Sequence, residues 1–129
     1  MNELLYIYTL KFIQMKKIAL SVVGILLLVL TLYFVSIYYI TYSEGYRAGE
    51  LVKFSHKGII FKTWEGEISQ GVSEAQRFSF SVEDNEKDVI KDLQDLQGKD
   101  VKLTYKERFG TFPWLGDTKY FITKVEKTE

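Results

Sequence analysis

The stretch Ile18–Ile40, IALSVVGILLLVLTLYFVSIYYI, decides the fold because it is a long apolar run without a single charge. A helix of this run would be about 34 Å long, and the hydrocarbon core of a bilayer is about 30 Å thick. Tyrosines gather at its C-terminal end, as aromatic residues do at a membrane interface. The sequence therefore predicts a transmembrane helix over residues 18–40.

The flanking charges predict how this helix is oriented. Three lysines precede it, and no small-x-small cleavage site follows it, so we interpret it as an uncleaved signal anchor. By the positive-inside rule, residues 1–17 form a cytoplasmic N-terminal segment, and residues 41–129 form an extracytoplasmic domain. The predicted location is the inner (cytoplasmic) membrane, with the C-terminal domain periplasmic. Met15 is a second candidate start of translation.

Composition excludes several classes of protein. The 129 residues contain no Cys, one His and equal numbers of acidic and basic side chains, 17 of each. A cysteine metal site, a disulfide scaffold and a cysteine nucleophile are excluded. Nucleic acid is not an expected partner, because the chain has no net positive charge to attract phosphates. We expect no cofactor and no metal.

The spacing of apolar residues in 41–129 changes along the chain. It is first every second residue, as in a strand, then every three or four residues, as in a helix, and then every second residue again. Apolar residues alternate over 78–82, whereas Val89, Leu93 and Leu96 lie on one helical face that Gly98 ends as a left-handed cap. The predicted elements are strands Glu50–His56, Ile59–Ile68 and Arg77–Val82, a helix of about three turns that follows Glu83–Asn85, and strands Val101–Tyr105 and Lys119–Lys127.

Five strands with one helix between the third and the fourth have the element order of the OB-fold, a small β-barrel. We predict an OB-like barrel, and another small barrel or a sheet with a helix is the alternative. The predicted core consists of Leu51, Phe54, Ile60, Trp64, Ile68, Phe78, Phe80, Val82, Leu93, Val101, Leu103, Tyr105, Ile122 and Val125.

The run Tyr42–Ile68, YSEGYRAGELVKFSHKGIIFKTWEGEI, resembles a family of uncharacterised short single-pass membrane proteins of Bacteroidota. The shared features are the apolar anchor, SEGYRAG and KTWEGE. The resemblance implies no activity, no cofactor and no catalytic residue. Some chains of this kind carry the label 6-phosphogluconate dehydrogenase, which we judge erroneous. This sequence has no GxGxxG after a strand and too little chain for a dinucleotide fold.

The loop between the last two predicted strands is the most informative stretch. Phe109, Phe112, Trp114 and Leu115 are four large apolar residues within a short segment, although loops usually face water. Three interpretations remain open. The loop folds over an end of the barrel, it enters the bilayer interface, or it contacts a partner or ligand.

Other candidate residues have a functional and a structural interpretation. Arg47 lies between two glycines and could bind a lipid headgroup or a partner carboxylate, and the alternative is a bent strand. Trp64 could stack on a small ligand or a glycan. His56 is expected in the turn Ser55–Gly58 that ends the first strand, and Glu65 and Glu67 on the solvated side of a strand. No residue is predicted to be catalytic.

These observations lead to two hypotheses of different classes. The first is a non-enzymatic, membrane-anchored module of the cell envelope that acts by protein or lipid contact, its partners being the lipid bilayer and an envelope protein. The alternative is an extracytoplasmic binder of a small ligand or glycan. A binder needs a concave pocket, whereas a contact module needs an exposed apolar patch.

Overall fold

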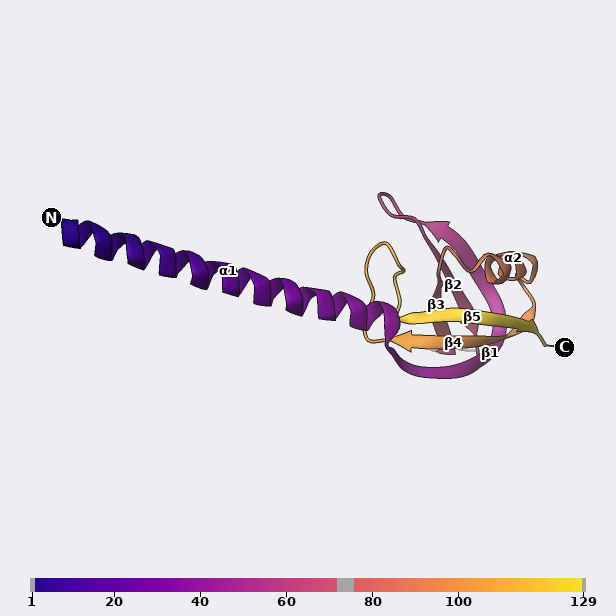
Figure 1. Ribbon diagram of the computed structural model, residues 1–129. Coiled ribbons are helices and arrows are strands. Elements are labelled where there is room, and N and C mark those ends of the chain that lie inside the picture. The colour runs from indigo at the N-terminus through magenta and orange to yellow at the C-terminus, as the bar shows by residue number, and fades with distance from the viewer. Residues whose placement is uncertain (1, 72–75, 129) are drawn as a thin grey trace. The chain divides into compact units, whose positions relative to one another are not determined.

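The chain forms two compact units, and each is described by itself. The computed structural model describes residues 2–71 and 76–128. Helix α1 (Asn2–Tyr39) is divided between the two units (Figure 1). Its residues up to Ser36 form the first unit, and its last three, Ile37–Tyr39, belong to the second. The second unit is a sheet domain with one helix.

Helix α1 is the one helix among the described residues that is long and apolar enough to cross a membrane. It begins at Asn2 rather than at the predicted Ile18. Residues 2–17 contain neither Gly nor Pro, so nothing in them interrupts the helical backbone. The helix supports single-pass membrane anchoring, as the sequence predicted.

The second unit has the predicted order of three strands, a helix and two strands. Its elements are β1 (Thr41–Lys57), β2 (Thr63–Ser69), β3 (Arg77–Val82), α2 (Lys87–Asp95), β4 (Asp100–Arg108) and β5 (Tyr120–Lys127). Among the residues that the structure describes, the predicted five strands and one helix of this domain are therefore confirmed.

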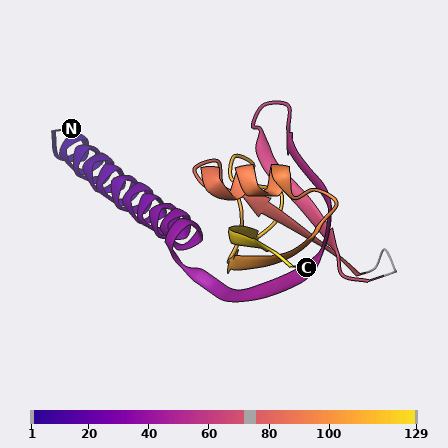
Figure 2. The same ribbon diagram turned by 90° about the vertical axis from the view of Figure 1, so that its right-hand side faces the viewer.

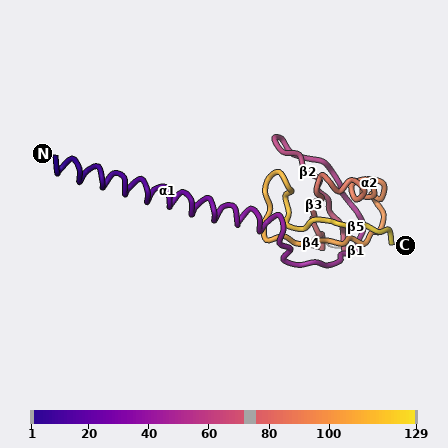
Figure 3. Tube along the Cα trace, in the orientation of Figure 1, coloured from indigo at the N-terminus to yellow at the C-terminus, as the bar shows by residue number. Residues whose placement is uncertain are grey.

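The strands pair in the order β1-β2-β3-β5-β4, and β4 returns to β1, so the sheet closes on itself. All pairs are antiparallel except β3 with β5, which is parallel. Residues 41–50 of β1 pair with β4 and residues 50–57 pair with β2. β1 therefore curves around the domain, as Figures 2 and 3 show, and its two ends lie at the same end of the sheet.

The first strand begins at Thr41, well before the predicted start at Glu50. Gly45 and Gly49, expected before the strand, lie within it. A Cβ on Gly49 would come within 2.4 Å of the Ser69 carbonyl oxygen, and one on Gly45 within 2.7 Å of the Tyr105 hydroxyl. These glycines are there because neighbouring groups approach the backbone closely.

The core lies inside the closed sheet, and α2 adds Val89, Ile90 and Leu93 to it. Most of the predicted core residues are buried, and Trp64 and Tyr105 are partly buried against them. Ile60 is an error in the prediction, because it is 85% exposed. In Figure 1, α2 lies at the end of the sheet away from the loop between β4 and β5.

Candidate functional site

The loop that joins β4 and β5 packs against the last residues of α1 that belong to the sheet domain. Phe112 is only 9% exposed, and its ring stacks 5.7 Å from Tyr38 and 4.7 Å from Trp114. The indole N–H of Trp114 donates a hydrogen bond to the Tyr38 hydroxyl. The aromatic side chains of this loop therefore pack against Tyr38, two residues before the end of the predicted membrane span, and Trp114 stays 42% exposed.

A compact turn gives the loop its shape. The Phe112 carbonyl accepts hydrogen bonds from the backbone N–H groups of Leu115, at 2.9 Å, and Gly116, at 3.2 Å. Pro113 fits such a turn, because its fixed φ suits the position after the first turn residue. Leu115 is half-buried, and Phe109, which is exposed, has its ring 5.6 Å from Tyr42. The four predicted loop residues thus have different environments.

Arg108, the last residue of β4, is buried and binds the end of α1. Its guanidinium donates to the carbonyl oxygens of Ile37, at 3.1 Å, and Tyr38, at 3.0 Å. It also forms an ion pair with Glu83 and lies 4.7 Å over the ring of Phe121. A cation is favourable here because the last carbonyl groups of a helix carry its negative dipole end.

Burial lowers the pKa of Arg108 from its ordinary value, and the nearby Tyr38 raises it. The guanidinium stays charged, because an arginine has a pKa above about 12 in water. Arg108 therefore supplies a permanent buried cation at the point where the chain passes from α1 into the sheet. Nothing in the local sequence singles out Arg108 for this role, because its partners lie in distant parts of the chain.

The loop between β1 and β2, residues 58–62, carries three exposed apolar residues that the sequence analysis assigned to a strand. Ile59 is 99% exposed, Ile60 85% and Phe61 50%. The strand begins only at Thr63, because Gly58 has φ +136°, which turns the chain before the apolar residues. The signal that could have revealed this loop is the glycine in front of a short apolar triplet.

The two loops lie at the same end of the sheet, where β1 begins (Figure 1). The rings of Phe61 and Trp114 are 6.0 Å apart with an edge-to-face orientation. Trp114 in turn contacts Tyr38. A continuous row of aromatic side chains therefore connects the tip of the β1–β2 loop to the last turn of α1.

The other predicted site residues lie elsewhere. Trp64 packs against the core, stacks 4.3 Å from the His56 ring, and donates to an Asp84 carboxylate oxygen at 3.2 Å. His56 lies in β1 and not in a turn. Arg47 stands 4.9 Å over the Phe78 ring and donates to Gln70 at 3.2 Å. None of these contacts joins Arg47 or Trp64 to the β4–β5 loop.

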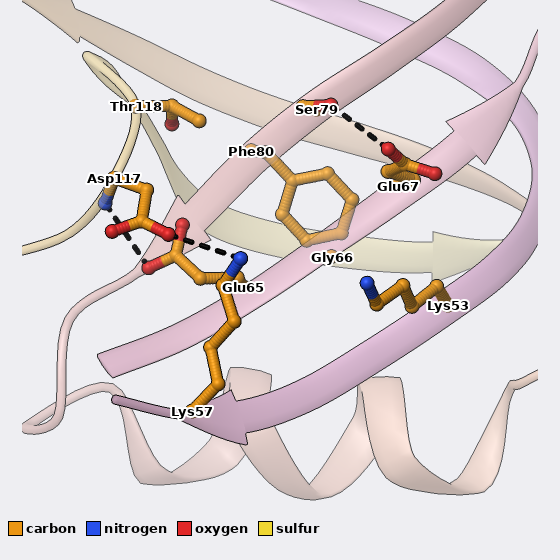
Figure 4. A pocket seen from close by; sticks show the side chains of 9 residues that line it. All are labelled: Lys53, Lys57, Glu65, Gly66, Glu67, Ser79, Phe80, Asp117 and Thr118. Atoms are coloured by element: carbon orange, nitrogen blue, oxygen red, sulfur yellow. Dashed lines mark hydrogen bonds and ion pairs between the residues drawn. The ribbon is translucent and has the colours of Figure 1, made fainter. Parts of the chain in front are cut away.

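A small cavity opens beside β2 and β3, with a volume of 220 Å³. Its lining residues are Lys53, Lys57, Glu65, Gly66, Glu67, Ser79, Phe80, Asp117 and Thr118. In Figure 4, Phe80 lies next to Gly66 in the centre, with Glu65 on one side and Glu67 on the other. A Cβ on Gly66 would come within 2.5 Å of the Phe80 ring, so a glycine is required there.

Glu65 is buried and not solvated as predicted, whereas Glu67 is half-buried. The Glu65 carboxylate accepts a hydrogen bond from the Ser81 hydroxyl at 2.5 Å and another from the Asp117 backbone N–H at 3.2 Å. Burial raises the pKa of Glu65 above the ordinary value of 4.5, although these hydrogen bonds lower it. Lys57, which could offset the charge, pairs with the Asp117 side chain at 3.1 Å instead.

A second, more open cleft of 610 Å³ lies beside Arg108. The basic side chains that line it are paired with acidic ones on the same wall. Lys87 lies 3.7 Å from Asp84, and Lys106 lies 3.9 Å from Glu83, which also binds Arg108. Because these charges compensate one another, the cleft offers no free cation cluster for an anionic ligand.

The geometry defines a small closed-sheet domain joined without a linker to a candidate membrane helix. The chain belongs to the family described as Domain of unknown function (DUF8785), whose model matches residues 40–129. This match confirms the predicted membership of an uncharacterised family and covers the whole sheet domain after the helix. No curated protein and no solved structure matches the chain. The described residues contain no group of three or more His, Asp or Glu that could hold a metal ion.

Proposed function

We propose that the protein is a single-pass module of the cell envelope that holds an OB-type barrel at the outer surface of the inner membrane and acts there by contact. The strand order with a parallel β3–β5 pair, and the helix between β3 and β4, support the OB-type assignment. The three lysines before residue 18 support a cytoplasmic N-terminus.

One observation carries this proposal. Arg108 binds the carbonyl groups of Ile37 and Tyr38, the Phe112 ring stacks on Tyr38, and Trp114 donates a hydrogen bond to its hydroxyl. A domain that folded independently of its anchor would be joined to it by a flexible, polar linker. Here the residues at which the span ends are part of the packed domain, so the barrel works within reach of the membrane surface.

The lack of a Cys in the chain gives the topology a direct test. Gln97→Cys introduces one exposed thiol after α2, and Asn2→Cys introduces one at the start of α1. In spheroplasts that express the full chain, we expect a membrane-impermeant maleimide to label Gln97→Cys at once and Asn2→Cys only after permeabilisation. The reverse pattern, or labelling of neither thiol before permeabilisation, contradicts the proposal.

The cavity beside Glu65 favours a second candidate, an extracytoplasmic binder of a small polar ligand. At 220 Å³ the cavity is below the usual range of about 300–1,000 Å³ for ligand pockets. It combines charged side chains of both signs with the face of Phe80, so a zwitterionic ligand fits its chemistry best. Trp64 and the aromatic loop, which the sequence analysis assigned to such a ligand, are not among its lining residues. A thermal shift by a zwitterion that Glu65→Gln abolishes would favour this alternative.

We assign no reaction to the domain. The contact proposal requires neither a nucleophile nor a cofactor, and the single histidine, His56, stacks on Trp64. A hydrolase or transferase screen of the full chain should give no activity above that of a Glu65→Gln, His56→Ala double variant. Activity lost in the double variant would contradict the non-enzymatic proposal.

A further inference from the structure

The tip of the β1–β2 loop, residues 59–61, exposes two isoleucines while its phenylalanine contacts Trp114. The side chains of Ile59 and Ile60 are almost entirely open to solvent, and Phe61 and Lys62 follow them in the chain. Isolated exposed apolar residues are common, but three in succession at the tip of a hairpin indicate a surface that meets an apolar phase.

We propose that Ile59, Ile60 and Phe61 insert into the outer leaflet of the same bilayer that holds α1, as a second point of membrane attachment. This inference rests on the proposed function, because it needs the barrel to stand at the membrane surface. It assigns lipid contact to a loop that the sequence analysis had placed in a strand.

Continuity with the end of the membrane span supports lipid as the occupant. Phe61 contacts Trp114, and Trp114 contacts Tyr38 at the end of α1. Tyrosine and tryptophan are the residues that prefer the interface between hydrocarbon and headgroups. The row of rings therefore leads from the end of the span to the apolar tip.

The flanking charges also fit a membrane. Lys57 and Lys62 stand on either side of the tip, and both are exposed. Lysines next to an apolar tip extend their charge to the headgroups while their methylene chains stay in the interface. Lys57 is partly compensated by Asp117 at 3.1 Å, whereas Lys62 lies next to Phe61 itself.

The size of the tip argues against a protein partner. A stable protein interface uses about 20–30 residues on each side, whereas the tip offers three. Three side chains suffice for lipid contact, because α1 already holds the domain at the membrane. Tethering turns a weak second contact into an intramolecular one with a high effective concentration.

The backbone sets the depth of insertion. A hairpin tip has backbone N–H and C=O groups without strand partners, and the hydrocarbon centre cannot satisfy them. The tip therefore reaches only the interfacial layer, where water is still available. A label on the tip should sense the upper part of the acyl chains and not the centre of the bilayer.

The test uses the full chain in vesicles of phosphatidylethanolamine with phosphatidylglycerol as the minor lipid. Single cysteines are introduced as Ile60→Cys at the tip, Gln97→Cys after α2 and Leu27→Cys in α1. Each is labelled with an environment-sensitive fluorophore. Emission is recorded with no quencher, and then with lipids that carry a spin label either high or low on the acyl chain.

We expect Ile60→Cys to give blue-shifted emission, quenched several-fold more by the shallow than by the deep spin label. Gln97→Cys, also exposed, serves as the matched control and should show neither effect. Replacing Phe61 by Ser beside the labelled Ile60→Cys should reduce the quenching by the shallow lipid, because the tip then loses an apolar neighbour.

Each other outcome overturns the inference in a recognisable way. If Ile60→Cys emits as in water while Leu27→Cys is quenched by the deep label, the tip does not insert although the anchor does. If the Ile60→Cys emission is blue-shifted without quenching by either lipid, a protein contact such as a second copy covers the tip. If Leu27→Cys is not quenched at all, the proposed membrane anchoring itself is wrong.

Discussion

The two apolar loops at one end of the sheet use similar residues for opposite purposes. In the β4–β5 loop, Phe112 and Trp114 pack against Tyr38, and Arg108 directly before the loop is buried. In the β1–β2 loop, Ile59 and Ile60 have no such cover. Apolar composition alone therefore does not identify a contact surface. The β4–β5 loop, which has more aromatic residues, packs through Phe112 and Trp114 against Tyr38. The shorter apolar triplet of the β1–β2 loop is exposed to solvent.

The largest expected effect on stability comes from removing the buried cation of Arg108. Arg108→Met leaves Glu83 without its buried partner and two helix carbonyls without a donor, which should lower the free energy of unfolding by about 3–5 kcal/mol. Urea unfolding of the full chain in mild detergent, followed by tryptophan fluorescence, measures it. Arg77→Met, which removes an exposed ion pair with Glu67, is the matched control and should cost less than about 1 kcal/mol.

Truncating the buried ring of the β4–β5 loop should have the next largest effect. Phe112→Ala removes a ring that stacks on Tyr38 and Trp114, and should lower the free energy of unfolding by about 3 kcal/mol, the low end for a buried phenylalanine because Phe112 is 9% exposed. Phe109→Ala, in the same loop but exposed, should cost less than about 1 kcal/mol. Equal losses in the same urea titration would show that the loop does not distinguish an inner from an outer face.

A smaller effect is expected from the buried carboxyl group beside the cavity. Because burial raises the pKa of Glu65 above 4.5, the folded domain holds this proton more tightly than the unfolded chain does. The stability that results is complete below pH 4.5 and is lost as the pH rises through the raised pKa. Glu65→Gln should therefore lose less stability than the wild type as the pH increases from 4.5 upward.

Urea midpoints measured at a series of pH values test this dependence. Glu67→Gln, on the same face of β2, is the control, and it should keep the wild-type pH profile because Glu65 is intact. If Glu65→Gln and the wild type keep parallel profiles, the carboxyl group of Glu65 titrates at its ordinary value, and the burial argument is wrong.

The smallest effect on stability is expected at the open loop. The double variant Ile59→Ser, Ile60→Ser should change the free energy of unfolding in detergent by no more than about 0.5 kcal/mol, because neither side chain is buried. A loss as large as that of Phe112→Ala would mean that the tip packs on the domain. The contrast between the two loops would then disappear.

Periodic patterns explain what the sequence could predict. The alternation over residues 78–82 and the helical spacing of Val89 and Leu93 depend on neighbours along the chain, and α2, β3 and the element order followed from them. Gly98 has the expected left-handed conformation, with φ +81°. The uncharacterised family was also predictable from the residues.

The features that could not be predicted depend on contacts between distant segments. Arg108 binds carbonyl groups about seventy positions earlier in the chain, so no local spacing reveals it. Glu65 alternates like a solvated strand residue, but Ser81 and the Asp117 backbone enclose it. Ile60 has the composition of a core residue, and only the turn at Gly58 places it outside.

Photo-crosslinking in cells tests whether the β1–β2 loop meets lipid while the β4–β5 loop packs internally. A photo-crosslinking residue is placed in the full chain at Ile60 or at Phe112, and the products formed in cells are identified by mass spectrometry. We expect a phospholipid adduct from position 60 and an internal crosslink to residues 37–39 from position 112. A discrete protein adduct from position 60, or lipid adducts from position 112 alone, would contradict it.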